Sequence, residues 1–398
     1  MKIVLSVHTA YPDFIGGREH HVHFLASELA RTDEVVVIAG GKSRKEQRRS
    51  MRGYTLVTLP MISIKVSTNP LQIYRIIPKF LSCLKQESPD ILHVFEYGSY
   101  STDITYFYAK KYKIPFLLNV YGYQFNKLFL KLSKKLYDQT IGKRLLKDAS
   151  KIFFSSKTQQ DEMLSIIKDG QIKNKMMLQE NSIRVDDYKN IAPNPDLARK
   201  YRTIDGVILL AVVRLLPRKG IKYLVDALHK IKNKSNAENI RLLIVGPDCG
   251  EQANLKRLVQ MYGLTSSVIF IGAVAPNEVK DFLSICDIFV LPSLYEGLPL
   301  VLLEAMASGR AVIFSDLNCA KTIIQNGVNG LLVPPTDSSA LAQAIVRLAH
   351  DKNLRQDLGT NAEKSIKGNN SYHEAQALRC EYGKALKRYQ AKTSAGIG

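Results

Sequence analysis

The chain has 398 residues, of which 45% are hydrophobic, so it can bury two cores and is too long for one ordinary domain. Its formal net charge of +20 indicates an anionic partner, such as a nucleotide, a nucleic acid or an acidic membrane surface. The five cysteines are scattered and never form a Cys-x-x-Cys pair, which argues against a disulfide framework and a zinc site.

Membrane spans and export signals are not expected. The apolar stretch that begins at Met1 is too short for a signal peptide, and no small-residue cleavage site follows it. No apolar run reaches the roughly 18 residues that a bilayer-spanning helix needs. We therefore expect a cytoplasmic protein that is at most peripheral on the cytoplasmic face of a membrane.

Short β-rich runs alternate with amphipathic helical stretches along the chain. In the first half, strands are expected at 2–7, 34–40, 54–60, 90–98, 115–122 and 151–156. In the second half, they are expected at 206–214, 240–247, 267–274, 288–293, 311–316 and 329–335. These runs are continuously hydrophobic, as in strands buried on both faces, and helix-length segments separate them. The pattern predicts parallel βαβ units.

Two domains follow from this pattern. The segment 188–206, rich in proline and charge, is expected to connect them. We predict an α/β protein with two doubly wound, Rossmann-like parallel-sheet domains that face each other across a cleft. The domains are expected at 1–190 and 191–370, followed at 371–390 by a final helix and at 391–398 by a loose tail. We expect the C-terminal segment, 371–398, to return to the first domain.

Two glutamates, Glu296 and Glu304, flank the sequence GLPLVLL after the expected strand at 288–293. Pro299 suits the first helical position and Gly309 suits the position after the helix end. Glu296 then lies at a strand end and Glu304 on the following helix, so both carboxylates border a helix N-terminus, which is itself an anion site. Ionised carboxylates only accept hydrogen bonds. A phosphate with sugar hydroxyls on each side, as in a nucleotide sugar, fits this arrangement.

Positive charge for a diphosphate comes from Arg214 at a strand end and Lys219 before the next helix. The sequence has no Asp-x-Asp, which argues against a divalent metal bridging the diphosphate and leaves these cations and the helix dipole to stabilise the leaving group. A strand, turn and helix with two glutamates is also common in α/β proteins, where the second acid is an ordinary solvated residue. The nearby cations favour the functional interpretation.

Together these stretches resemble the retaining glycosyltransferases of family four, which have the GT-B fold. The matching sequences, in the family's order, are GGREHHVHFLASEL, VVRLLPRKG, IRLLIVGP, VIFIGAV, PSLYEGLPLVLLEAMASG and NGVNGLLVPP. The resemblance implies metal-independent transfer of a hexosyl or N-acetylhexosaminyl group, with retention, from a nucleotide-diphosphate sugar. The acceptor would be a glycan or a lipid-linked molecule in cell-surface polysaccharide or glycolipid synthesis. UDP is expected rather than GDP because it is common among activated sugars, and no cofactor is expected.

The resemblance also implies roles for individual residues. Glu296 would contact the donor sugar and Glu304 the ribose, while Arg214 and Lys219 would hold the diphosphate. Glu296, Arg214 and Lys219 are thus the expected catalytic residues. The other expected donor-binding residues are Gly16, Gly17, Gly246, Gly272, Gly297, Leu298, Pro299 and Leu300.

The acceptor side departs from the family's pattern. Tyr121 stands where the family often has a histidine close to the transferred sugar, and a tyrosine is a poor base near neutrality. Ser182 and Arg184 replace a glycine and an acid of the family. His93 is expected either to line the cleft on the acceptor side or to be a satisfied, partly buried histidine.

Three histidines cluster after the glycine pair, and basic residues cluster in two runs of the first half. The histidines that follow the glycine pair, His20, His21 and His23, are expected to pack and to make polar contacts, because no nearby Cys or Asp completes a metal site. A basic run spans 42–52. A second basic stretch carries Lys127, Lys131, Lys134 and Lys135 around Phe129, Leu132 and Leu136. It predicts either an ordinary solvated helix or a face of the basic first domain that docks on anionic lipid.

Other classes of protein fit less well. A dinucleotide-dependent oxidoreductase would need Gly-x-Gly-x-x-Gly after an early strand, and the chain lacks it. No aromatic RNA-binding signature or zinc-finger spacing occurs, so no nucleic-acid partner is expected. A non-catalytic partner subunit that keeps the donor-binding fold stays open as the alternative, because of Tyr121.

Overall fold

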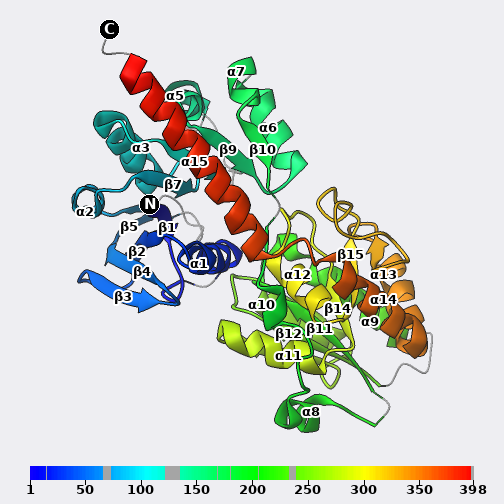
Figure 1. The fold of residues 1–398 in the computed structure, drawn as a ribbon. Coiled ribbons are helices and arrows are strands. Elements are labelled where there is room, and N and C mark those ends of the chain that lie inside the picture. Colours follow the sequence, from blue (N-terminus) through cyan, green and yellow to red (C-terminus); the bar gives the residue numbers. More distant parts are fainter. Residues whose placement is uncertain are drawn as a thin grey trace. The chain divides into compact units, whose positions relative to one another are not determined.

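The computed structural model describes residues 1–14, 16–65, 73–121, 135–167, 169–179, 181–204, 206–232 and 239–395. The chain divides into two compact units. Unit 1 comprises Met1–Ser182 and Ser371–Gly398, and unit 2 comprises Ile183–Asn370. The first boundary therefore lies at 182/183, where the sequence led us to expect 190/191. Figure 1 shows the elements of both units.

Unit 1 contains an eight-stranded sheet with the order β10-β9-β8-β7-β1-β2-β4-β3. Its strands are β1 (Lys2–Thr9), β2 (Glu34–Gly41), β3 (Gln47–Met51), β4 (Tyr54–Pro60), β7 (Ile91–Phe95), β8 (Phe116–Val120), β9 (Lys151–Phe154) and β10 (Met176–Leu178). Every pair is parallel except β3 with β4. A separate antiparallel pair joins β5 (Ile62–Lys65) to β6 (Ile73–Ile76).

Helices cover both faces of this sheet. They are α1 (Gly17–Leu29), α2 (Phe80–Glu87), α3 (Tyr100–Tyr112), α5 (Lys143–Asp148), α6 (Lys157–Ile167), α7 (Gly170–Lys173) and α15 (Ser371–Ala395), with a π turn at Asp138–Gly142. Side chains of β1 alternate between the two cores: Leu5 packs with α1 and α15, and Val4 packs with α2 and α3. This alternation explains why the strand is hydrophobic throughout.

The last helix belongs to unit 1, although it follows unit 2 in the chain. Helix α15 packs on the same face of the sheet as α1, and Figure 1 shows it in red close to the dark blue α1. Arg379 of α15 forms an ion pair with the buried Asp33 at 2.7 Å. The helix continues to residue 395, so the expectation of a loose tail from 391 is wrong for the described part of that tail.

Unit 2 contains a fully parallel six-stranded sheet with the order β13-β12-β11-β14-β15-β16. Its strands are β11 (Val207–Val212), β12 (Ile240–Val245), β13 (Val268–Gly272), β14 (Ile288–Leu291), β15 (Ala311–Ser315) and β16 (Leu331–Val333). Counted along the chain, the order is 3-2-1-4-5-6, as in dinucleotide-binding folds. The prediction of two doubly wound parallel-sheet domains is confirmed.

The helices of unit 2 are α8 (Pro195–Tyr201), α9 (Ile221–Lys232), α10 (Gln252–Met261), α11 (Val279–Ile285), α12 (Leu300–Ala307), α13 (Ser338–His350) and α14 (Lys352–Ser365). Three 3₁₀ turns lie at η2 (Val185–Asp187), η3 (Pro217–Lys219) and η4 (Pro276–Glu278). Helix α8 lies inside the segment that was expected to be only a connection. Its Tyr201 is buried, so this segment is part of unit 2.

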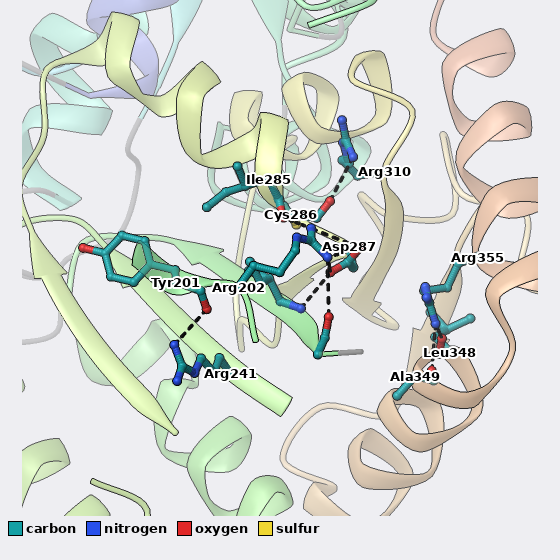
Figure 2. Close-up of polar contacts among 12 residues, drawn as sticks. Tyr201, Arg202, Arg241, Ile285, Cys286, Asp287, Arg310, Leu348, Ala349 and Arg355 are labelled. Atoms are coloured by element: carbon teal, nitrogen blue, oxygen red, sulfur yellow. Dashed lines mark hydrogen bonds and ion pairs between the residues drawn. The ribbon is translucent and has the colours of Figure 1, made fainter. Parts of the chain in front are cut away.

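Several arginines of unit 2 bind main-chain carbonyls at the amino ends of the strands (Figure 2). Arg202 donates to the Ile285 carbonyl at 2.7 Å and to Asp287 at 3.1 Å. Asp287 also accepts the main-chain N–H of Ile208 at 2.8 Å. Arg310 donates to the Cys286 carbonyl at 3.0 Å. Part of the positive charge is therefore used to hold unit 2 together, at the edge of the sheet opposite the carboxyl ends of the strands.

Candidate active site

The site of unit 2 is set by its strand order. Strand β11 pairs with β12 on one side and with β14 on the other, so the connections that follow β11 and β14 leave in opposite directions. Ligands of doubly wound sheets bind at the carboxyl ends of the strands at this switch point. Arg214 and Lys219 follow β11, and Ser293 and Glu296 follow β14. The residues predicted to bind the donor are thus brought together from two segments.

The central contact is an ion pair between the Lys219 ammonium and Glu296 Oε1. The Ser293 hydroxyl donates to the same oxygen at 2.8 Å. The side chains of Lys219 and Glu296 are only 13% and 9% exposed. A carboxylate held by two donors in a largely dry place is fixed in position before a ligand arrives.

Gly220 explains why the two loops can approach so closely. Its φ is +68°, and a Cβ at this position would lie 1.9 Å from the carbonyl oxygen of Pro292. Next to it, the N–H of Leu294 donates to the Arg218 carbonyl at 2.8 Å. Only glycine combines this left-handed backbone with this contact. Gly220 therefore brings Lys219 within reach of Glu296.

Three cations lie close together after β11. Burial lowers the pKa of the Lys219 ammonium, the charge of Glu296 opposes that change, and the charges of Arg218 and Arg214 add to it. Arg214 itself is exposed. Glu296 compensates only one of these charges, so an anion with more than one negative charge, such as a diphosphate, fits beside the pair.

Helix α12 begins one residue later than the sequence suggested. Pro299 has extended backbone angles and precedes the first helical residue, Leu300, while Gly309 has the expected left-handed conformation after the helix end. The side chains of Leu298 and Leu300 are only 2% and 5% exposed and belong to the core. Any contact of these two leucines with a donor must come from their main chain. Gly297 and Pro299 lie in the same turn between β14 and α12.

Glu304 lies deeper than expected. It is 8% exposed, and burial raises its pKa to about 7, although a hydrogen bond from Tyr188 and the charge of Lys280 act in the opposite direction. Tyr188 is itself buried, and the Lys280 ammonium lies 4.9 Å from the centre of its ring. The interpretation of Glu304 as an ordinary solvated residue is therefore wrong. Near neutral pH, its carboxyl group is poised between its two protonation states.

Gly246 and Gly272 lie at the carboxyl ends of two strands: Gly246 directly follows β12, the neighbour of β11, and Gly272 is the last residue of β13, the neighbour of β12. The Gly246 N–H donates to the Gly272 carbonyl at 2.8 Å, and both glycines have positive φ angles. A Cβ at Gly246 would lie 1.8 Å from the Val213 carbonyl oxygen, so this glycine allows close packing beside the residue that precedes Arg214. Among the described residues, apart from Gly272 and its two chain neighbours, no heavy atom lies within 4 Å of a Cβ built at Gly272. Of the two, Gly272 has the open space that a nucleotide base would need.

In unit 1, Gly16 precedes α1 and Gly17 is its first residue. Tyr121 follows β8, and its hydroxyl lies 2.8 Å from His21 Nδ1. The other ring nitrogen of His21 lies 2.8 Å from a carboxylate oxygen of Glu374 on α15. Burial raises the pKa of Tyr121 further above neutrality, and the charge of Glu374 adds to this. Tyr121 therefore stays neutral and is held as a hydrogen-bonding group.

Two other residues of unit 1 have structural roles. The hydroxyl of Ser182, which replaces the family's glycine, donates to the carboxylate of Glu374. His93 is completely buried, with one ring nitrogen 2.6 Å from the Tyr382 hydroxyl and the other 2.6 Å from Asn119 Oδ1. The expectation that His93 lines the acceptor side is therefore wrong, because the ring lies between the sheet and α15. The alternative prediction holds, because His93 is a buried histidine whose two ring nitrogens both have hydrogen-bond partners.

The clustered histidines pack as expected. His23 bonds the Tyr54 hydroxyl at 2.8 Å, and the ring centre of His20 lies 5.1 Å from that of Tyr11. Within the described ranges, no group of three or more His, Cys, Asp or Glu side chains is placed to hold a metal ion.

The two basic runs differ in how much the structure says of them. Arg48 and Arg49 are paired with Glu87 and Asp13, so part of the 42–52 run is neutralised. Lys127, Lys131, Lys134, Phe129 and Leu132 lie outside the described residues. In the part of the chain that the structure does describe, no helix is both long and apolar enough to cross a bilayer.

Sequence reasoning missed three residues of the unit 2 site: Ser293, Gly220 and Tyr188. The first two had a usable signal. Ser293 follows a buried strand and a proline, and Gly220 directly follows two cations, and both patterns indicate a structured loop. No sequence signal pointed to Tyr188, because its contact with Glu304 depends on the way η2 packs against α12.

Comparisons with known proteins agree with this geometry. Residues 15–172 match the family "Glycosyltransferase Family 4", and residues 198–365 match "Glycosyl transferases group 1". An uncharacterized glycosyltransferase of Methanocaldococcus jannaschii is 26% identical over 380 residues, which cover 92% of this chain and 93% of that protein.

Another relative is the N,N'-diacetylbacillosaminyl-diphospho-undecaprenol alpha-1,3-N-acetylgalactosaminyltransferase of Campylobacter jejuni. It is 32% identical over 155 residues, which are 39% of each protein. Among solved structures, Anabaena HepE in complex with UDP superposes with a TM-score of 0.73 at 17% identity, covering 96% of this chain and 100% of that one. This likeness shows the GT-B fold. With both halves matching glycosyltransferase families, the chain belongs to the family-four (group 1) glycosyltransferases.

Proposed function

We propose that the chain is a retaining glycosyltransferase that moves a sugar from a UDP-sugar, without a divalent metal, to a glycan or lipid-linked acceptor. The acceptor would belong to cell-surface polysaccharide or glycolipid synthesis. The observation that carries the proposal is the Lys219–Glu296 pair at the switch point of unit 2, with Arg214 exposed beside it.

Each group of the site has a role in this reaction. Lys219 and Arg214 bind the diphosphate, and the first turn of α12 offers main-chain N–H groups to the same charge. Glu296 accepts a hydrogen bond from a hydroxyl of the transferring sugar. As the sugar leaves, negative charge grows on the diphosphate, and the fixed cations stabilise it. Glu304, when ionised, accepts the ribose hydroxyls.

Retention follows if the acceptor attacks from the side on which the diphosphate leaves. The bond between the anomeric carbon and the diphosphate oxygen breaks, and a bond to the acceptor oxygen forms. The acceptor's proton passes to the departing diphosphate, so the protein need not supply a base. Tyr121 fits this scheme because burial raises its pKa and keeps its hydroxyl protonated.

The nucleotide and the acceptor are proposed from similar proteins. HepE was solved with UDP and with UDP-glucose, and the name of the Campylobacter relative includes a diphospho-undecaprenol acceptor. A lipid-linked acceptor would also suit a basic protein that works beside an anionic membrane surface.

A thermal-shift experiment tests the donor. UDP and UDP-glucose should raise the Tm of the full chain more than GDP does, with and without EDTA, since a ligand at 100 times its Kd stabilises by about 2.7 kcal/mol. The Lys219→Met variant should lose most of the shift. A Tm that no nucleotide changes would contradict the proposal, as would a shift that EDTA abolishes and magnesium restores.

A second candidate is a non-catalytic partner subunit that binds the nucleotide sugar. The observation in its favour is that the Tyr121 hydroxyl, at the place of the family's histidine, is already engaged by His21. The two candidates separate in one assay. A catalytic protein releases UDP from UDP-glucose when acceptors are present, whereas a binding subunit shows the thermal shift and no release.

A further inference from the structure

Unit 1 has its own switch point, and a second pair of a cation and a glutamate lies there. Strand β1 pairs with β2 on one side and with β7 on the other, so the crevice lies at the carboxyl ends of β1 and β7. Arg18 lies in the first turn of α1, which follows β1, and Glu96 directly follows β7. Arg18 Nη1 donates to Glu96 Oε1 at 2.6 Å. In topology, this pair is the counterpart of Lys219 and Glu296 in unit 2.

The pair is part of a larger built network. Arg18 Nη2 donates to Thr9 Oγ1 and to Glu19 Oε1, both at 2.8 Å, and the Thr9 hydroxyl donates to Glu19 at 2.7 Å. Gly16 makes room for this arrangement, because a Cβ there would lie 2.5 Å from Glu19 Oε2. Burial opposes the ionisation of Glu19, but the charge of Arg18 and the bond from Thr9 keep its pKa below the usual value. The guanidinium is therefore held in place by the ionised Glu19, by Thr9 and by Glu96.

The network leaves polar atoms unused. Arg18 Nε, Glu96 Oε2 and His8 Nδ1 are all buried and have no hydrogen-bond partner among the described residues. His8 is 7% exposed, and its pKa responds to the charges of Glu96, Arg18, Arg75 and Glu19, which lie near it. The side chains of Arg18 and Glu96 are 21% and 23% exposed, so the pair is partly open. Buried unpaired donors and acceptors are unfavourable unless a ligand group uses them.

The charge of the network indicates the ligand chemistry. Two carboxylates, Glu19 and Glu96, pair directly with the Arg18 guanidinium, and burial lowers the pKa of His8, which keeps that ring neutral although Glu96 opposes the change. A phosphate would be repelled by the free oxygen of Glu96. A hydroxyl group is different, since a hydroxyl can donate to Glu96 Oε2 and can also accept from a donor such as Arg18 Nε.

We propose that Arg18 and Glu96 bind a hydroxyl group of the acceptor sugar and so select the acceptor. The inference rests on the proposed glycosyl transfer and names the acceptor side of that reaction. Glu96 contacts the substrate as a specificity residue, and Thr9 and Glu19 position Arg18.

The test measures sugar binding without any donor. Ligand-observed NMR titrations would use the full chain with methyl glycosides of glucose, galactose, mannose and N-acetylglucosamine. We expect at least one glycoside to bind, with a Kd at least tenfold weaker in Glu96→Gln. Glutamine keeps the shape and a bond to Arg18, so this variant should fold, as a thermal melt would verify.

The matched control is Glu87→Gln. Glu87 also pairs with an arginine of unit 1, Arg48, but it lies near Lys2, at the amino end of β1. Its Kd for the glycoside should stay within twofold of that of the wild type. The proposal is overturned if no glycoside binds, or if Glu96→Gln binds as the wild type does. It is also overturned if Glu96→Gln binds glucose 1-phosphate more tightly, because that result indicates a phosphate ligand.

A parallel melt with UDP separates this proposal from the proposed function. If UDP raises the Tm of the wild type and of Glu96→Gln equally while glycoside binding is unchanged, only the acceptor site is overturned. If UDP has no effect on the wild type, the proposed function fails, and the glycoside titrations still decide on Arg18 and Glu96.

Discussion

Lys219 and Glu296 form an ion pair although 77 positions separate them in the chain. The pair exists because β11 and β14 are neighbours in the sheet and because Gly220 allows the loops that follow them to touch. Each side chain compensates the other in a largely buried place. Removing either one leaves a poorly solvated charge, so effects on stability and on catalysis must be measured separately.

Glu296→Gln should lower kcat more than it changes KM for the donor. Glutamine keeps the shape of the side chain but weakens its bond to a sugar whose charge changes in the transition state. We expect kcat to fall about 100-fold, the usual scale for one electrostatic contact. Steady-state UDP release at several donor concentrations measures both constants.

Glu304→Gln is the matched comparison. Its contact with the ribose would be made equally in the ground and transition states, so KM for the donor should rise more than kcat falls. Indistinguishable kinetic profiles for the two variants would show that the roles of the two glutamates are assigned wrongly.

Donor affinity should depend on pH through Glu304. Its pKa of about 7 means that the carboxylate, which accepts ribose hydroxyls, is lost as the pH falls below neutrality. The Kd for UDP should therefore rise as the pH falls from 8 to 6 in the wild type. It should change much less in Glu304→Gln. Isothermal titration across this range provides the measurement, with UMP as a second ligand that shares the ribose.

Glu304 should affect folding stability in the opposite direction from UDP affinity: a lower pH weakens UDP binding but stabilises the fold. A carboxyl group whose pKa is raised on folding binds more protons in the native state, so stability falls as the pH rises between the unfolded value and about 7. Glu304→Gln removes this loss, worth up to about 3 kcal/mol. The variant should gain stability relative to the wild type at pH 8 and gain little at pH 5. Equal gains at both pH values would contradict the raised pKa.

Gly220→Ala should separate the two loops. The substitution places a methyl group against the Pro292 carbonyl and forces a left-handed backbone on alanine. We expect a loss of more than about 3 kcal/mol in the free energy of unfolding, together with weaker UDP binding. Gly327→Ala is the control. The φ of Gly327 is +79°, and in the described part of the chain no heavy atom beyond its two chain neighbours lies within 4 Å of an added Cβ, so only the backbone cost of about 1–2 kcal/mol remains. Urea unfolding with equal losses for the two variants would refute the role of the close contact.

Asp287→Ala should affect stability alone. Asp287 accepts from Arg202 (Figure 2), and it also accepts the main-chain N–H of Ile208 at the amino ends of the strands. Losing both bonds should cost about 2 kcal/mol, while the UDP-induced rise in Tm stays unchanged. Asp196→Ala, whose partner Arg199 is exposed, should change stability by less than about 0.5 kcal/mol. A reduced UDP shift in Asp287→Ala would show that this network reaches the site.

The sequence was sufficient for most of the fold because its buried strands are continuously hydrophobic. It failed where local pattern and final environment differ. Strand β3 reads QRRSM and is recognisable only through its pairing with β4 at the sheet edge. Helix α8 was read as a connection, although Asn194 caps it by accepting two N–H groups and a proline begins it. That Asn-Pro pair is a helix-start signal.

The site was predictable in its residues and not in its contacts. Glu296 and Lys219 were named from motifs, but their pairing depends on which strands are adjacent. His93 was misplaced because the pattern of β7 does not reveal that Tyr382, from a helix 289 positions away, covers it. Arg18 and Glu96 were missed for the same reason: their relation appears only when β1 and β7 lie side by side.

We predict that the second basic stretch binds the surface of an anionic membrane. Lys135 and Leu136 are exposed, Leu136 by 67%, and the rest of the second basic stretch lies outside the described residues. Each lysine near an anionic leaflet contributes about 1 kcal/mol, within a Debye length of about 8 Å at physiological salt. Four such residues would hold the protein reversibly where a lipid-linked acceptor lies. We expect co-sedimentation with vesicles containing phosphatidylserine, weakened by high salt.

Two quadruple glutamine variants decide whether this stretch is the binding face. The first replaces Lys127, Lys131, Lys134 and Lys135. The second removes the same charge from exposed positions elsewhere in unit 1, at Lys79, Lys85, Lys111 and Lys113. If the first stretch docks on lipid, the first variant should lose most of its binding and the second should keep it, because attraction to a surface falls off within a Debye length. Equal losses would indicate only a general effect of net charge. A wild-type protein that ignores the vesicles at low salt would show that the stretch is solvated, and the acceptor would then be a soluble glycan.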